Sequence, residues 1–246
     1  MKAIQYARSL LFHFLFYFTT TAMVVLLSPL LLMPRAWSMT ALNLNARLEI
    51  FLLRVIAGIN LEVRGRENLM DGACIVASKH QSAFETFALV TQLRDPAYLM
   101  KKELFRIPFH GWFSHKFGMI PVARDQGAKA LREMLKAAQK RTAAGREIII
   151  FPEGTRRPVG AEPDYKTGVF LLYQALKVPC VPVALNSGMF WPRRTLLLTP
   201  GTIVFEFLPP IPAGLPRAEF LSRLEETVES ASNRLVAEAR EQRDRG

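Results

Sequence analysis

The N-terminal part of the chain carries one long apolar segment. From Ser9 to Pro34 there is no Lys, Arg, Asp or Glu over 26 residues, and Leu, Phe, Val and Met dominate. A helix that crosses a bilayer needs about 20 such residues. The apolar region of a cleaved signal peptide has about 7–15 and precedes a small-residue cleavage site, which this segment lacks. The pattern therefore predicts a membrane-inserted helix, and Pro29 and the Thr19–Thr21 cluster leave room for a kinked or re-entrant one.

The next segment, residues 41–59, is apolar but interrupted by Asn43, Asn45, Arg47, Glu49 and Arg54. This mixture is typical of an amphipathic helix that lies at a membrane interface or packs on the first helix. Near residues 57–62 the apolar helical segments give way to a strand-like alternation of apolar and polar residues, so we expect the linker between the two parts of the chain here. We therefore expect membrane-inserted or interfacial helices in 1–58 and a separate folded domain in 59–246.

Short apolar runs alternate with segments of helical spacing in the second part. Helices are predicted at 82–93, 108–118, 127–145, 168–177 and from about Arg217 onward. Strands are predicted at 61–65, 73–78, 97–103, 119–124, 147–151, 180–185 and 202–208. Strands that alternate with helices of this length predict an α/β domain with a largely parallel or mixed sheet flanked by helices.

The charge of the chain suits negatively charged binding partners but does not say which kind. With 32 basic and 21 acidic residues the net charge is +11, which suits phosphates, anionic lipid headgroups or nucleic acid. Both cysteines, Cys74 and Cys180, lie in strand-like apolar runs and are expected to be buried free thiols. Their spacing gives no disulfide framework and no CxxC site, which fits a reducing, cytosol-facing domain.

The stretch SKHQSAFET, residues 78–86, carries the clearest candidate chemistry. Residues five apart in one helix differ by about 140° and do not share a face, so His80 and Glu85 cannot pair within a helix. They can pair if His80 follows the strand and Glu85 lies in the first turn of the next helix. The carboxylate would then orient the imidazole as a general base. The alternative is a capping box from Ser82 to Glu85, with His80 merely nearby.

Cations follow three other predicted strands. FPEGTRRP (151–158) turns at Pro152 and Gly154 and then presents Arg156 and Arg157. Lys101, Lys102 and Arg106 lie at or after the end of the strand at 97–103, and Arg124 ends the strand at 119–124. Taken alone, each of these cations is expected to be a solvated side chain on the surface. If the strands are neighbours, the cations meet at one sheet edge and predict a phosphate pocket.

Several other site types are not indicated by the sequence. It contains no GxSxG, P-loop or GxGxxG motif. His110 and His115 lack the HExxH pattern, so no zinc site and no bound cofactor are expected.

Four blocks occur in order: KHQSAFE (79–85), KKELFRIPFHG (101–111), FPEGTR (151–156) and VPCVPVAL (178–185). Together they resemble the 1-acylglycerol-3-phosphate O-acyltransferase family over about residues 62–188, for which an apolar N-terminus is also usual. The commoner family residue at position 85 is Asp, and the one at position 79 is often Asn. Glu85 keeps the negative charge of Asp on a longer side chain. With Lys79, the stretch resembles a bacterial subset of the family that has a similar KHQSAxET string.

The resemblance implies a role for each matching position. His80 would be the general base and Glu85 its partner, in a direct attack on an acyl thioester without an acyl-enzyme. The acceptor phosphate would be held by Lys102, Arg124 and Arg156. The pocket would be shaped by Glu153, Gly154 and Thr155, and residues 178–183 would help to form the acyl-binding wall.

The implied reaction moves a fatty acyl group from an acyl-ACP or acyl-CoA thioester to 1-acylglycerol-3-phosphate, which gives phosphatidic acid. We expect it at the inner (cytoplasmic) membrane, with the catalytic domain facing the cytoplasm, membrane lipids as partners and no nucleic acid. One alternative is an acyltransferase for another lysolipid, such as a lyso-ornithine lipid. A second is a non-enzymatic basic module that binds anionic lipid or nucleic acid, with affinity falling as salt rises.

Overall fold

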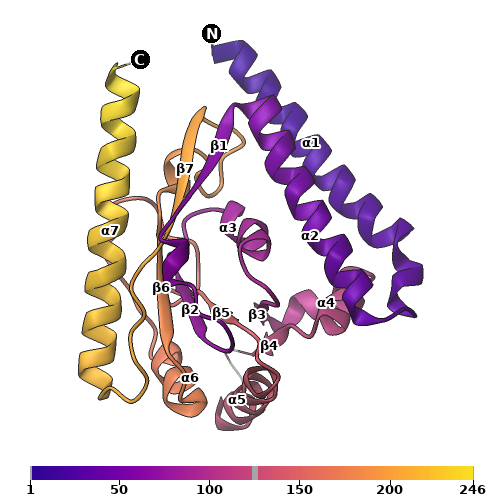
Figure 1. Ribbon diagram of the computed structural model, residues 1–246. Coiled ribbons are helices and arrows are strands. Elements are labelled where there is room, and N and C mark those ends of the chain that lie inside the picture. Colours follow the sequence, from indigo (N-terminus) through magenta and orange to yellow (C-terminus); the bar gives the residue numbers. More distant parts are fainter. Residues whose placement is uncertain (1, 124–126, 246) are drawn as a thin grey trace.

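A seven-stranded mixed sheet forms the centre of the molecule, in a computed structural model that describes residues 2–123 and 127–245 (Figure 1). The strand order is β1-β7-β6-β2-β5-β3-β4. Every predicted strand is confirmed, with ends shifted by a few residues. The strands are β1 Ile59–Arg64, β2 Ile75–Ser78, β3 Ala97–Lys101, β4 Ile120–Val122, β5 Ile148–Ile150, β6 Cys180–Leu185 and β7 Gly201–Phe207.

The pairing explains where polar loops can gather. β2 pairs in parallel with β5, β5 with β3, and β3 with β4. β6 and β7 are antiparallel, so the sheet is mixed as predicted. The carboxyl ends of four neighbouring strands therefore meet at one edge, which is where α/β sheets place their ligands.

Helices cover both faces of this sheet. In Figure 1 the long helix α7 lies along one face, and α1, α2 and α3 lie on the other. The predicted helices are confirmed, although α3 is a short α-helix followed by a 3₁₀ turn at Leu89–Thr91. The helices are α1 Lys2–Leu26, α2 Arg35–Leu52, α3 Phe84–Ala88, α4 His110–Phe117, α5 Gly127–Ala143, α6 Gly168–Leu176 and α7 Arg217–Arg245.

Alternation along each strand divides the buried side chains between two cores. Val76 packs in the core that contains Phe12 of α1. Its neighbours Ile75 and Ala77 pack in the core that contains Phe220 of α7. Helix α1 is therefore not only an apolar appendage, because its Phe12 is fully buried in the same core as the sheet.

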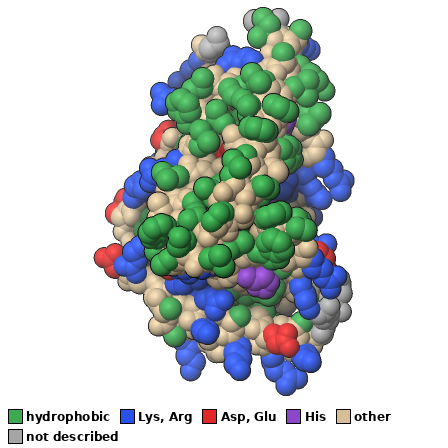
Figure 2. All heavy atoms as spheres, turned by 90° about the vertical axis from the view of Figure 1, so that its right-hand side faces the viewer, with side chains coloured by type: hydrophobic (Ala, Val, Ile, Leu, Met, Phe, Trp, Pro, Cys, Tyr) green, Lys and Arg blue, Asp and Glu red, His purple; other side chains and the backbone are tan. Residues whose placement is uncertain are grey.

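The hairpin of α1 and α2 presents an apolar outer face. Helix α1 is long and apolar enough to cross a membrane, by length and composition. Most of the exposed large hydrophobic side chains of the described chain belong to this hairpin, and Figure 2 shows them gathered on one side of the molecule. They include Leu10, Leu11, Phe14, Phe18, Trp37, Leu44, Leu48 and Phe51. Such a face is typical of membrane contact.

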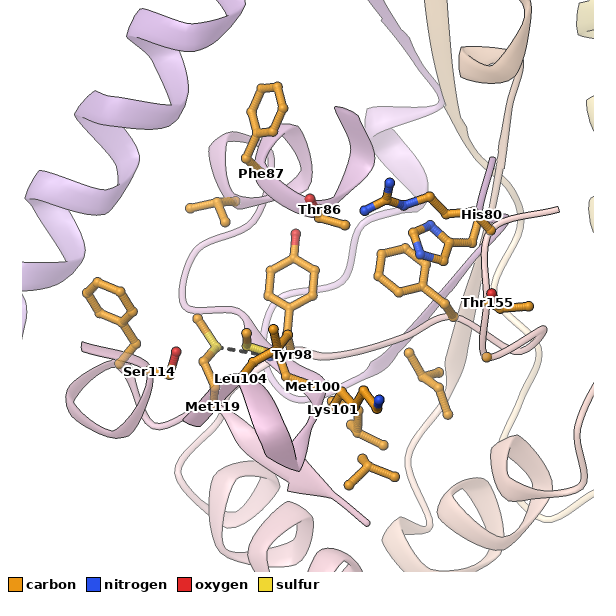
Figure 3. A pocket seen from close by; sticks show the side chains of 18 of the residues that line it. His80, Thr86, Phe87, Tyr98, Met100, Lys101, Leu104, Ser114, Met119 and Thr155 are labelled. Atoms are coloured by element: carbon orange, nitrogen blue, oxygen red, sulfur yellow. Dashed lines mark hydrogen bonds between the residues drawn. The ribbon is translucent and has the colours of Figure 1, made fainter. Parts of the chain in front are cut away.

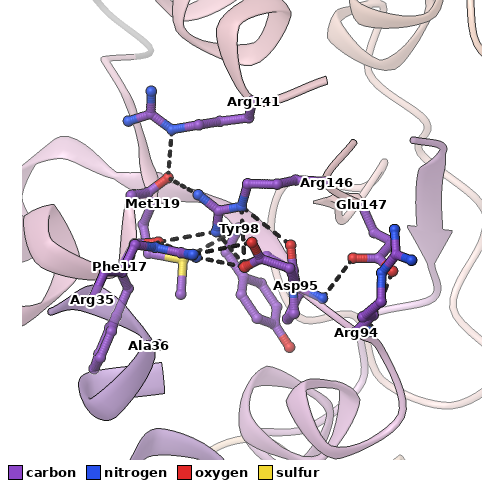
Figure 4. A network of polar contacts seen from close by, with 12 residues as sticks. Arg35, Ala36, Arg94, Asp95, Tyr98, Phe117, Met119, Arg141, Arg146 and Glu147 are labelled. Carbon is purple, nitrogen blue, oxygen red and sulfur yellow. Dashed lines mark hydrogen bonds and ion pairs between the residues drawn. The ribbon is translucent and has the colours of Figure 1, made fainter. Parts of the chain in front are cut away.

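An ionic network of the half-buried Arg35 and Asp95 with the buried Arg146 fastens the start of α2 to the sheet (Figure 4). Arg35 donates two hydrogen bonds to the carboxylate of Asp95, at 3.0 and 2.5 Å. Arg146 lies 3.2 Å from the same carboxylate and also donates to the carbonyl of Phe117 over 2.9 Å. Burial lowers the pKa of Arg146 to about 10, so the guanidinium stays charged at neutral pH. The hairpin is thus held to the domain by charge as well as by apolar packing.

Glu49 of α2 is buried against α1 at 1% exposure. Thr19 Oγ donates to its Oε1 over 2.5 Å, whereas its Oε2 accepts no hydrogen bond from the residues described. Burial raises the pKa of this carboxyl from 4.5 to about 7, against a smaller lowering by the Thr19 bond. Glu49 is therefore protonated in the folded chain over a pH range in which it ionises in the unfolded chain.

We expect the stability contributed by neutral Glu49 to be complete below about pH 4.5 and lost as the pH rises through about 7. The difference corresponds to on the order of 3 kcal/mol. Glu49→Gln carries no charge at any pH and should remove this component. Thermal midpoints in detergent, measured at about pH 5 and pH 8, should fall more for the wild type than for the variant. Equal falls would contradict the assignment.

Candidate active site

His80 lies directly after β2, in the loop that leads to α3. The strand pairing continues into this loop, because Lys79 N–H donates to the carbonyl of Val183 over 2.9 Å. The His80 ring stacks on Phe151 with 4.0 Å between ring centres. Its Nδ1 lies 2.9 Å from Oε1 of Glu85, the second residue of α3. The loop-plus-first-turn arrangement predicted from the spacing is confirmed.

Glu85 is fully buried, and both of its carboxylate oxygens are satisfied. Oε1 accepts from the backbone N–H groups of Gln81 and Ser82, at 2.7 and 2.6 Å, as well as contacting His80. Oε2 accepts from Ser187 Oγ over 2.9 Å. The carboxylate therefore closes the turn and contacts the histidine at the same time. The two interpretations weighed for Glu85 therefore hold together, because a carboxylate oxygen accepts several hydrogen bonds.

The contact with Glu85 sets the chemistry of the imidazole. When Nδ1–H donates to the carboxylate, Nε2 is left as a proton acceptor. In the described part of the chain no group donates to Nε2, and His80 lines a large cavity (Figure 3). The ring is 12% exposed and is held by stacking and by the carboxylate. This arrangement suits a general base acting on a group bound in the cavity.

The cavity has a volume of about 1040 Å³ and passes under the α1–α2 hairpin. Figure 3 places His80 and Thr155 on one side of it and Phe87 and Ser114 on the other. One end is mainly apolar and is walled by side chains from four helices, although Thr20, Asn45 and Glu49 of the hairpin also line the cavity. The apolar side chains are Phe16, Met23 and Val24 of α1, Leu42 of α2, Phe87 of α3, Val90 of the 3₁₀ turn after α3, and Phe113 and Phe117 of α4.

The other end of the cavity carries cations. Arg156 lines it, as predicted, and among the residues described no carboxylate pairs with its guanidinium. Lys101, one of the cations predicted at the end of the strand at 97–103, lines it too. Lys166 was not predicted; it lines the cavity and pairs with Asp164 over 2.7 Å. The predicted Lys102 is half-buried at the start of a 3₁₀ turn and is not among the described lining residues. The predicted Arg124 lies outside the described residues.

The FPEGTR loop supplies the floor between the histidine and the cations. Glu153, Gly154 and Thr155 all line the cavity. Gly154 has a φ of +66°, which a side chain would strain, so the tight turn requires glycine. Glu153 is buried, and its Oε2 accepts the backbone N–H of His80 over 3.2 Å. Burial raises the pKa of Glu153, and the hydrogen bond from Lys79 opposes the rise.

The expected acyl wall at residues 178–183 is wrong. β6 lies in the interior of the sheet between β2 and β7, and all its side chains are buried. Within the described ranges, no residue of 178–183 lines the cavity. An apolar strand at the centre of a sheet packs against the covering layers on both faces, so it has no open side to offer a ligand. The helical hairpin supplies the apolar wall instead.

Comparison with known proteins identifies the family and supports the fold. Residues 60–186 match the family model described as Acyltransferase. The 1-acyl-sn-glycerol-3-phosphate acyltransferase of Pseudomonas aeruginosa is 34% identical over 206 residues, which cover 82% of this chain and 80% of that one. The human 1-acyl-sn-glycerol-3-phosphate acyltransferase beta is 28% identical over 66% of this chain, but only 60% of its own length is covered.

A solved structure has the same fold. It is the crystal structure of the 1-acyl-sn-glycerophosphate (LPA) acyltransferase, PlsC, from Thermotoga maritima. The two superpose with a TM-score of 0.76 over 93% of this chain and 97% of that one, at 22% sequence identity. At that identity the likeness concerns the fold, including the N-terminal hairpin and the sheet.

Proposed function

The chain belongs to the acyltransferase family, and on that premise we propose that it acylates the free hydroxyl of 1-acylglycerol-3-phosphate to give phosphatidic acid. The observation that carries the proposal is His80, held by Glu85 at 2.9 Å and open to a cavity with one apolar and one cationic end. A lysophospholipid has the same division, with an acyl chain at one end and a phosphate at the other.

The proposed step needs only the two substrates and the side chains of the site. His80 Nε2 takes the proton of the acceptor hydroxyl as the hydroxyl oxygen attacks the thioester carbonyl carbon. The ester C–O bond forms, and collapse of the tetrahedral intermediate breaks the C–S bond. The thiolate leaves with the proton that His80 carried. Glu85 stabilises the imidazolium in between, and no acyl group is attached to the protein.

The two ends of the cavity divide the lipid substrates between them. The apolar side chains of the hairpin and α4 suit an acyl chain, because burying each methylene contributes about 0.8 kcal/mol. Arg156, with Lys101 and Lys166, suits the acceptor phosphate, which a guanidinium binds through two hydrogen bonds. Lys102 and Arg124 stay predictions for the same role.

The exposed face of the α1–α2 hairpin fits a membrane-associated enzyme whose acceptor and product are both lipids. In this proposal residues 1–58 associate with the inner membrane, and residues 59–246 carry out catalysis on its cytoplasmic side. Either acyl carrier protein or coenzyme A can present the thioester, since both carry it on a pantetheine arm.

Replacing Arg156 with methionine should raise the KM for lysophosphatidic acid by about 10–100-fold, the effect of losing a charge-assisted hydrogen bond. The value of kcat should change much less, because the base and the acyl site are intact. The measurement is thiol release from acyl-CoA and acyl-ACP at varied acceptor concentration. Lys136→Met is the matched control, because Lys136 is exposed on α5 and does not line the cavity within the described chain.

The same assay with a panel of acceptors separates the alternatives. Lysophosphatidic acid should be the best acceptor of wild-type protein, ahead of lysophosphatidylcholine and a lyso-ornithine lipid. A preference for the lyso-ornithine lipid, unaffected by Arg156→Met, would replace the proposed acceptor. Lipid binding without any thiol release would favour a binding module instead.

A further inference from the structure

A charge cluster lies behind the His80 loop, and of its members Glu153 lines the large cavity whereas Lys79, Tyr165 and Glu229 are not among the described lining residues. Lys79 is 3% exposed, and its Nζ donates to Glu153 Oε1 over 2.8 Å and to Glu229 Oε1 over 2.7 Å. Tyr165 OH donates to the same oxygen of Glu229 over 3.0 Å. Glu229 belongs to α7, so the cluster joins the C-terminal helix to the residue that precedes His80.

The cluster reaches His80 through the backbone. Glu153 uses one oxygen for Lys79 and the other for the N–H of His80, over 3.2 Å. On the other side of the residue, Arg157 N–H donates to the carbonyl of His80 over 2.8 Å. The loop at residues 151–158 thus holds both peptide groups of His80. Lys79 fixes the carboxylate that makes one of those two bonds.

The charges make Lys79 necessary to this arrangement. Two carboxylates, Glu153 and Glu229, share one ammonium group, and buried charges are stable only when paired and hydrogen-bonded. Glu153 is fully buried, and its burial favours the protonated form, which Lys79 opposes. Without the ammonium group, the two carboxylates would repel each other, and Glu153 would lose the contact that orients it toward His80.

We propose that Lys79, anchored by Glu229 of α7, is a positioning residue: it orients Glu153, which in turn fixes the backbone of His80. The C-terminal helix is then part of the active-site support and not only a cover for the sheet. Lys79 does not line the large cavity among the residues described, so it does not act by touching substrate. The inference rests on the proposed function, because it concerns the orientation of the same base.

Lys79→Met should lower kcat by about 10–100-fold, because a displacement of the base by about 1 Å has effects of that size. The KM for lysophosphatidic acid should change by less than about 3-fold, since the cation end is untouched. Glu229→Gln keeps the Lys79–Glu153 pair but weakens the anchor, and should lower kcat by a smaller factor, about 3–10-fold. Glu226→Gln, an exposed carboxylate on the same helix, is the matched control and should be unchanged.

A double variant separates positioning from simple stability. Lys79→Met leaves two carboxylates without their cation, so its Tm should fall. Lys79→Met with Glu229→Gln removes one of those charges, and part of the Tm should return. If Lys79 positions His80, kcat stays at least about 10-fold low in the double variant despite the recovered Tm. Recovery of kcat together with Tm would overturn the inference.

The remaining outcomes distinguish failure of the positioning role from failure of the proposed function. If Lys79→Met cannot be purified folded, Glu229→Gln carries the test, and an unchanged kcat in that variant overturns the inference. Wild-type turnover of lysophosphatidic acid is measured in the same series. Its absence would count against the proposed function, whereas normal wild-type turnover with normal kcat in Lys79→Met would count against the positioning role alone.

Discussion

Replacing His80 with alanine is expected to lower the rate of acyl transfer by about 10³-fold, within the range that general-base catalysis contributes. The imidazole is the group between the carboxylate of Glu85 and the cavity, with Nδ1 at 2.9 Å from Oε1. Alanine removes the base and leaves the cation end and the apolar wall in place. The KM for the acceptor should therefore change little. Initial rates of thiol release from acyl-CoA, with lysophosphatidic acid saturating, measure the effect.

The fold should survive this substitution, because the His80 side chain makes one stacking contact and one polar contact. Thermal midpoints check that expectation. His115→Ala is the matched control, since His115 is exposed and does not line the cavity in the described chain. It should keep its rate within about two-fold of wild type. A His80→Ala rate above about a tenth of wild type would contradict the role of base.

Glu85→Gln is expected to lower the rate by at least about 10-fold, a floor below the usual contribution of acid–base chemistry. The glutamine oxygen can still accept from Gln81 and Ser82, and its amide can donate to Ser187, so the turn should keep its shape. What is lost is the charge that stabilises an imidazolium during the reaction. The same thiol-release assay, with kcat and KM separated, measures the loss.

The fold of this variant should stay close to wild type, with a small change in Tm. Glu103→Gln is a matched control, because Glu103 is an exposed carboxylate beside the cavity-lining Lys101. It should leave kcat unchanged. A fully active Glu85→Gln protein would restrict Glu85 to the turn and leave His80 without a functional partner.

The order of strands and helices could be predicted because short apolar runs alternate with segments of helical spacing along this chain. The run around Val76 is one example: all of β2 is buried, with Val76 in one core and Ile75 and Ala77 in the other. The pairing of His80 with Glu85 could also be predicted. A residue at a strand end and a residue in the next helical turn are close in sequence, so local geometry decides whether they meet.

Contacts between distant segments could not be predicted in this way. Lys79 and Glu229 are 150 positions apart, and nothing in the local pattern of α7 marks Glu229 among its other acidic residues. At the end of β3 the sequence could not decide between two neighbouring cations: Lys101 lines the cavity, and Lys102 stays a prediction for phosphate binding. At a strand end the chain leaves the regular alternation, so the facing residue depends on the following turn.

The position of the apolar wall was predicted wrongly from the sequence. A conspicuous apolar block at 178–183 is a buried central strand, and the cavity is walled by α1, α2 and α4 instead. The hairpin was expected to be inserted in the membrane or to lie at its interface. Its inner face, with Phe12 and Leu53 fully buried, belongs to the domain core. An amphipathic or apolar helix has the same pattern whether its partner is lipid or protein.

The double-mutant cycle between His80 and Glu85 tests the central claim most directly, that the two side chains act as one base. The measured quantity is kcat for thiol release by wild type, His80→Ala, Glu85→Gln and the double variant. The account predicts that the double variant is as slow as His80→Ala, within about 3-fold, because Glu85 has no charge to stabilise once the imidazole is gone. Losses that multiply, with the double variant at least about 10-fold slower than His80→Ala, would show that the two act independently and would contradict the account.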